Sequence, residues 1–141
     1  MHILTVESIT KAEDLLNTEE STNWLLDVSA SYHVIPFRSQ FHSYTARDFE
    51  LVRVGNSQHC AVVGIGSIEL SLPGGSTLVL SDVRHVPDLR RSLISVGQLD
   101  EAGIRASFTS GGWTLHRGNL LLACGPKVHS LYPLNVTRER T

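Results

Sequence analysis

The sequence predicts a single all-β domain, a barrel or a sandwich, and three observations support this prediction. From residue 24 onward the apolar runs have the length of strands, several of them alternate polar with apolar residues, and glycine-containing turns separate them. Many short strands joined by such turns are typical of barrels and sandwiches. The chain has 141 residues, of which 41% are hydrophobic, and this length suits one domain with one core.

The first half of the chain provides four expected strands. The apolar run at 24–28 (WLLDV) has the length of a strand, and residues 49–55 (FELVRVG) alternate. Residues 60–72 (CAVVGIGSIELSL) contain two glycines and then alternate again. The Pro-Gly-Gly turn at 73–75 joins this segment to a return strand at 76–86, so we expect a hairpin here.

The second half begins with a further apolar run at 92–99 (SLISVGQL), after which Gly103 could end a short helix. Residues 105–125 predict two more hairpins, which turn at 111–112 and at 118–119, where glycines occur. A last short strand near the C-terminus completes the pattern. The all-β class is therefore expected to extend to the end of the domain.

The first 22 residues differ from the rest and are expected to form a leader. Val6 and Ile9 begin a series of apolar residues at helical spacing, which favours a short amphipathic helix or a partly ordered segment. We therefore divide the chain into a leader at 1–22, an all-β domain at 23–136 and a tail at 137–141.

The composition excludes several classes of function. A formal net charge of −2 provides no basic surface for nucleic acid or for an anionic membrane, so neither is expected as a partner. Cys60 and Cys124 match no zinc or redox spacing, and the seven histidines include no pair at the spacing of metal ligands. We therefore predict no metal and no cofactor.

The expected location is intracellular, either cytoplasmic or nuclear. The N-terminus (MHILTVESITKAED) meets charged residues too early for a signal peptide, and no apolar run is long enough to cross a bilayer. Two free thiols also fit a reducing compartment better than a disulfide does.

The apolar run at 24–28 contains a single carboxylate, Asp27, just before the end of the run and a turn of small residues. Backbone N–H groups of such a turn can bond the carboxylate and hold it in place, as an acid–base group requires. An aspartate that only caps a turn at the end of a strand produces the same pattern. These residues alone leave both interpretations open.

A series of motifs resembles the protease region of Ty1/copia-type retrotransposon polyproteins, a branch of the retropepsin-like aspartic proteases. The motifs, in order, are "WLLDVSASYHVIP", "FHSY", "VRVGN", "CAVVGIGSIEL", "LSDVRHVPDLRRSLISVGQLDEAGI" and "LHRGNLLLACG…SLYPLNV". The resemblance extends over residues 23–136, and "DVRHVPDLRRSLISVGQL" is its most specific part. It implies a retropepsin-like barrel with one half of an active site in each chain.

The resemblance implies aspartic protease chemistry, in which two carboxylates share one proton and one water molecule. One aspartate acts as the general base on the water, and the other donates a proton to the scissile carbonyl. Only Asp27 lies in the matching sequence context, so a complete pair would require a second copy of the chain. The implied enzyme is a C2 homodimer with Asp27 of each subunit at the axis, and its substrate is a protein or a peptide.

Three further segments receive roles from the same resemblance. The active-site loop would comprise Val28, Ser29, Ala30 and Ser31. The flap hairpin, which covers bound substrate, would include Gly55, Asn56, Ser57, Gln58 and His59. Support behind the loop would come from the packing of Leu93, Ile94 and Val96, and from Gly97, which allows close backbone approach. An ordinary surface hairpin at 55–59 is an equally open interpretation.

The sequence departs from the family next to the acid. The family motif is Asp-Ser/Thr-Gly-Ala, and here it is Asp27-Val28-Ser29-Ala30. Val28 lacks the hydroxyl that bonds across the dimer axis in the family, and an unsatisfied buried partner costs about 1–3 kcal/mol. Ser29 adds a side chain where glycine gives access, and a displacement of about 1 Å can lower a rate on the order of a hundredfold. We therefore expect proteolysis to be weak or absent rather than strong.

Three functions remain open at this point. The first is a homodimeric aspartic endopeptidase that uses Asp27 of each subunit. The second is a catalytically inactive, host-retained module of the same fold that binds a protein or peptide partner, which Val28 and Ser29 favour. The third is a monomeric structural domain in which Asp27 only caps a turn.

Overall fold

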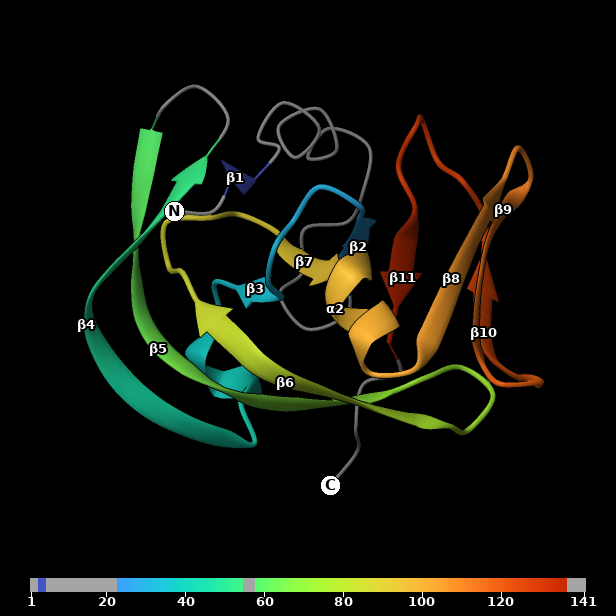
Figure 1. Cartoon of the computed structure of the whole chain (residues 1–141), viewed down its shortest axis with the longest axis horizontal. Coiled ribbons are helices and arrows are strands. Elements are labelled where there is room, and N and C mark those ends of the chain that lie inside the picture. The colour runs from blue at the N-terminus through green and yellow to red at the C-terminus, as the bar shows by residue number, and fades with distance from the viewer. Residues whose placement is uncertain (1–2, 5–22, 55–57, 137–141) are drawn as a thin grey trace.

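The computed structural model describes residues 3–4, 23–54 and 58–136 (Figure 1). Strands predominate, so the prediction of an all-β fold is confirmed. In this part of the chain no helix is long and apolar enough to cross a membrane. The elements are β1 (Ile3–Leu4), β2 (Asn23–Asp27), β3 (Val34–Ile35), the 3-10 helix η1 (Arg38–Gln40), β4 (Ser43–Val54), β5 (Gln58–Ser71), β6 (Thr77–His85), β7 (Ser92–Ser95), α2 (Val96–Glu101), β8 (Ile104–Thr109), β9 (Gly112–Arg117), β10 (Leu120–Gly125) and β11 (Pro133–Asn135).

Among the described residues the strands form two sheets. Eight of them pair in the order β1-β4-β5-β6-β3-β7-β2-β11, and a smaller sheet has the order β10-β9-β8. The long strands β4, β5 and β6 are antiparallel neighbours that curve around the centre of the domain (Figure 1). β2 pairs in parallel with β7 and antiparallel with β11. Two segments that are distant from it in sequence therefore flank the strand that carries Asp27.

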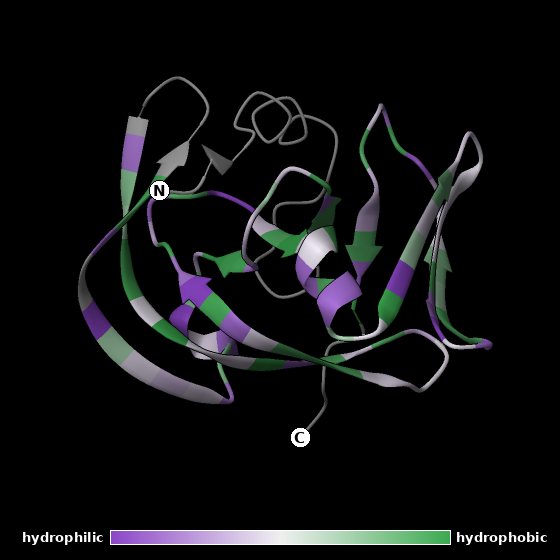
Figure 2. Cartoon of the chain, viewed as in Figure 1, coloured by the Kyte–Doolittle hydropathy of each residue, from purple (hydrophilic) through white to green (hydrophobic). Residues whose placement is uncertain are grey.

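The central strands are buried. Every residue of β7 is buried, and β2 buries Trp24, Leu25 and Leu26. Continuous burial explains why these strands appear in the sequence as unbroken apolar runs rather than as alternating ones. Hydrophobic residues dominate β2, β3 and β7 in Figure 2, whereas hydrophilic residues are more frequent in β4 and α2. Asp27 thus lies at the end of a strand that the core holds in place.

Trp113 joins the smaller sheet to the larger one. Its indole Nε1 donates a hydrogen bond of 2.9 Å to the carbonyl oxygen of Pro133 on β11, and the side chain is 4% exposed. A Cβ on Gly125 would lie 2.6 Å from the Trp113 ring, so only glycine permits this close packing. The smaller sheet is therefore fixed at the edge formed by β11.

The short helix expected before Gly103 is present, but it begins earlier than predicted. The apolar run at 92–99 divides between β7 and α2, with the boundary at Ser95. The Ser95 side chain accepts a hydrogen bond from the Gln98 backbone N–H, which caps the helix. Gly103 has φ of +87°, as expected for a glycine that follows a helix.

The leader and the tail fall largely outside the described residues, and the predicted amphipathic helix lies entirely outside them. Ile3 and Leu4 form β1, which pairs in parallel with Arg53 and Val54 on β4. This short strand therefore joins the far edge of the larger sheet.

Candidate active site

Asp27 is the last residue of β2 and is half-buried. Its Oδ1 accepts two hydrogen bonds from Ser29, one of 2.8 Å from the backbone N–H and one of 2.7 Å from the hydroxyl. The backbone bond is the one that a turn of small residues can provide. The hydroxyl bond exists because a serine stands where the family motif has glycine. Ser29 therefore orients the carboxylate directly.

The other residues of the active-site loop differ in burial. Val28 is 73% exposed, whereas Ala30 is 5% exposed and packs in an apolar cluster with Leu25 and Val34. Within one chain, Val28 thus occupies no position in the core. The contact across a dimer axis that the resemblance implies for this position stays a prediction.

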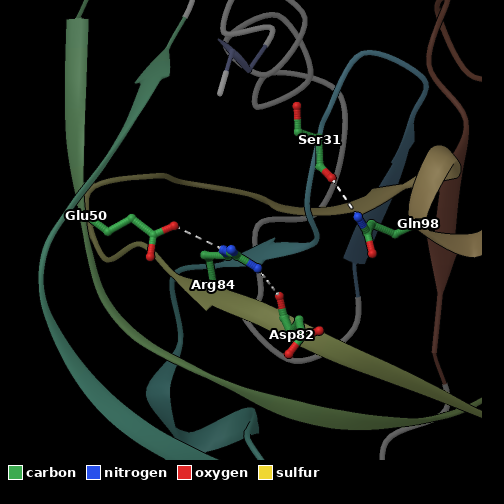
Figure 3. A network of polar contacts seen from close by, with 5 residues as sticks. All are labelled: Ser31, Glu50, Asp82, Arg84 and Gln98. Atoms are coloured by element: carbon green, nitrogen blue, oxygen red, sulfur yellow. Dashed lines mark hydrogen bonds and ion pairs between the residues drawn. The ribbon is translucent and has the colours of Figure 1, made fainter. Parts of the chain in front are cut away.

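Ser95 supports the active-site loop from behind. It pairs with Asp27 in the parallel register of β2 and β7, and it is completely buried. Its hydroxyl donates a 2.8 Å hydrogen bond to the carbonyl of Ala30 and accepts one of 3.1 Å from the N–H of Gln98. The Gln98 side chain in turn donates to the carbonyl of Ser31 at 3.1 Å (Figure 3). The first turn of α2 is therefore bonded to the loop.

His33 is a second support, and no motif distinguishes it from the other six histidines of the sequence. The side chain is 3% exposed, and burial lowers its pKa to about 4. Its Nδ1 accepts a 3.0 Å hydrogen bond from the backbone N–H of Ser95. The ring is therefore neutral near pH 7 and carries its proton on Nε2. In the sequence, His33 lies between the active-site loop and the apolar residues Val34 and Ile35. This position was the available signal that the side chain is buried.

The structure shows how the residues predicted to support the active-site loop are packed, and their role as a support stays a prediction. Leu93 and Ile94 are buried, and Val96 packs against the core from a half-buried position. The close backbone approach expected at Gly97 is wrong for this chain, because a Cβ there would meet only the Ser95 Oγ, at 3.8 Å. The hydroxyl of Ser95 makes the contact to the loop instead.

The hairpin predicted as a flap is present as β4 and β5, whose ends pair through Val54 and Gln58. Its tip at Gly55, Asn56 and Ser57 lies outside the described residues, as does the side chain of Gln58. His59 follows on β5 and is exposed. The role of this hairpin as a cover over substrate stays a prediction.

Comparisons with known proteins agree with the fold. Residues 24–104 match the model of a family described as "Pol polyprotein, beta-barrel domain". The chain is 43% identical over 114 residues to the "Retrovirus-related Pol polyprotein from transposon TNT 1-94" of Nicotiana tabacum, a match that covers 81% of this chain and 9% of that protein. No solved structure matches the chain. Because the family match covers more than half of the sequence, the chain belongs to the β-barrel domain family of Pol polyproteins, of the Ty1/copia type.

Proposed function

We propose that this domain is one subunit of a homodimeric aspartic endopeptidase derived from a retrotransposon Pol polyprotein. The observation that carries the proposal is the environment of Asp27, a carboxylate at the end of a buried strand that two hydrogen bonds from Ser29 orient. A single carboxylate cannot act as general base and general acid in the same step. Each subunit would therefore contribute one Asp27 across a two-fold axis.

In the proposed dimer, the two Asp27 carboxylates share one proton, because like charges close together resist joint ionisation. The ionised carboxylate takes a proton from water as the water attacks the peptide carbonyl, and the protonated one donates to the carbonyl oxygen. The two hydrogen bonds that Ser29 donates to Asp27 both reach Oδ1. We therefore assign the proton transfers to Oδ2 of each Asp27.

The substrate we propose is a protein or peptide in an intracellular compartment, cytoplasmic or nuclear. Both cysteines, Cys60 and Cys124, are free thiols, which supports a reducing compartment. The net charge of −2 gives no reason to propose nucleic acid or membrane as a partner.

A second candidate is a catalytically inactive, host-retained module that binds a protein or peptide partner. The exposure of Val28, at 73%, favours it, since an apolar side chain stands beside the acid where the family motif has a hydroxyl. In this alternative the fold is retained and the pair of carboxylates does no chemistry. Val28 would then contribute apolar contact area to a partner.

Two experiments in sequence test the proposal. Analytical ultracentrifugation should show a dimer, and a peptide-cleavage assay at mildly acidic pH should show activity that Asp27→Asn abolishes. A monomer at all concentrations, or equal cleavage rates for both proteins, would refute the enzyme. If a dimer forms without measurable cleavage, the double variant Val28→Ser with Ser29→Gly restores the family motif. Cleavage gained in that variant supports a weakened protease, and continued inactivity favours the binding module.

A further inference from the structure

Arg84 on β6 contacts residues from two other parts of the fold, and Figure 3 shows its contacts with Glu50 and Asp82. Its Nε lies 3.4 Å from Oε2 of Glu50 on β4. The carbon at the centre of its guanidinium group lies 3.4 Å from the centre of the Tyr32 ring, directly after the active-site loop. A third contact, from its Nη1 to the carbonyl of Asp82 at 2.9 Å, fixes the guanidinium to its own strand. Arg84 therefore links β4, β6 and the loop.

The register of the sheet explains why Glu50 can reach Arg84 although β5 lies between them. Glu50 pairs with Val62 on β5, and Arg84 pairs with Ile65 on the same strand. The register of β4 shifts between Ala46 and Glu50, and an irregularity of this kind alters which side chains of neighbouring strands face one another. Glu50 is thus the first paired residue of β4 after this shift in register.

Arg84 also bonds, through its backbone, to the segment that follows the active-site loop. Its N–H donates a 2.9 Å hydrogen bond to the carbonyl of His33, the residue after Tyr32. The contacts from Ser95 and Gln98 hold the loop from β7 and α2, so Arg84 is a separate support that comes from β6. Arg84 thus contacts two adjacent residues, Tyr32 through its guanidinium group and His33 through its backbone N–H.

The contact between Arg84 and Glu50 is more shielded from water than an ordinary surface pair. Their side chains are 12% and 29% exposed, whereas those of the pair His42 and Glu69 are 65% and 50% exposed. Partly buried charges are less screened by salt, and a guanidinium gains more from an aromatic face when it is partly desolvated. Glu50 also balances the charge that Arg84 places beside the loop.

We propose that Arg84 is a positioning residue for the active site, which couples the loop, through Tyr32, to β4, through Glu50. Its effect on catalysis rests on the proposed function, but the coupling itself exists whether or not the dimer cleaves peptides. Because coupling between two sites is reciprocal, a change at Glu50 alters the loop and a change at Tyr32 alters β4.

Amide hydrogen exchange of the full chain tests the coupling without depending on activity. Glu50→Gln should speed exchange of the amides at 28–33, which include the active-site loop and the two residues after it, by about two- to fivefold. Tyr32→Leu should speed exchange at 50–54 by a similar factor. Both factors are those expected for the loss of one partly exposed contact. Tyr32→Phe keeps the ring under the guanidinium and should change these rates less than Tyr32→Leu does. Glu69→Gln, which removes the carboxylate of the exposed contact between His42 and Glu69, is the matched control and should leave the loop unchanged.

Kinetics provide the second readout if the wild type shows cleavage that depends on Asp27. Glu50→Gln should then lower kcat by about two- to fivefold with little change in KM, because a positioning contact acts mainly in the transition state. The coupling would be refuted if exchange changes only in the strand that carries the substitution. It would also be refuted if Glu69→Gln changes the exchange of the loop as much as Glu50→Gln does. Absence of cleavage in both the wild type and the double variant Val28→Ser with Ser29→Gly would remove the proposed function, while the exchange data would still decide the role of Arg84.

Discussion

Protonation of His33 should destabilise the domain as the pH falls. The side chain is 3% exposed, and burial lowers its pKa to about 4. Its Nδ1 accepts a hydrogen bond from the Ser95 N–H at 3.0 Å. A protonated ring would direct an N–H at another N–H and would place a charge in the core, so the folded state resists protonation.

The size of the effect follows from the difference in pKa between the folded and unfolded chain. The ordinary pKa of 6.5 exceeds the folded value of about 4, so the unfolded state binds more protons between these two values. The free energy of unfolding therefore decreases as pH falls through this window and levels off below it. At 1.36 kcal/mol for each pH unit, the full loss is about 3 kcal/mol, of which about 2 kcal/mol falls between pH 7 and pH 5. Burial also lowers the pKa of His85, which contributes with the same sign.

Urea denaturation at pH 7 and pH 5 measures this loss, with His33→Asn as the informative variant. The Asn side-chain oxygen can accept from Ser95 but does not titrate, so this variant should lose about 2 kcal/mol less than the wild type between the two pH values. His42→Asn changes a 65% exposed side chain and should keep the wild-type dependence. Equal losses for the wild type and His33→Asn would refute the reasoning.

Further predictions concern glycines and the support of the loop, all measured by urea denaturation at pH 7. Gly64→Ala should destabilise the domain by about 1–3 kcal/mol, because the new Cβ would overlap the Tyr44 ring. Gly97 in α2 has room for a Cβ, so Gly97→Ala should stabilise the domain by about 0.5–1 kcal/mol. A loss of stability in this variant would show that the position requires glycine. Ser95→Ala should cost about 2–3 kcal/mol, since it removes a helix cap and a buried hydrogen bond. Ser81→Ala, at an exposed position, is the control for Ser95→Ala. Equal losses of stability in the two variants would contradict a supporting role for Ser95.

The strands could be predicted because their signals are local. The turn at 73–75 and the apolar run at 24–28 depend only on neighbouring residues. The start of α2 was missed because the apolar run at 92–99 has no change of periodicity that separates strand from helix. Ser95 followed by Gln98 was the available signal, since serine with glutamine three residues later is typical of a helix N-terminus.

By itself, the sequence determined the all-β class, the family and the carboxylate Asp27, because strand patterns and motifs are encoded in short stretches. Only the tertiary structure showed what holds that carboxylate's loop. The contact between His33 and Ser95 spans 62 positions, and the pair of Glu50 and Arg84 spans 34. The register of the sheet, including the shift in β4, brings these residues together, and no local pattern of residues specifies it.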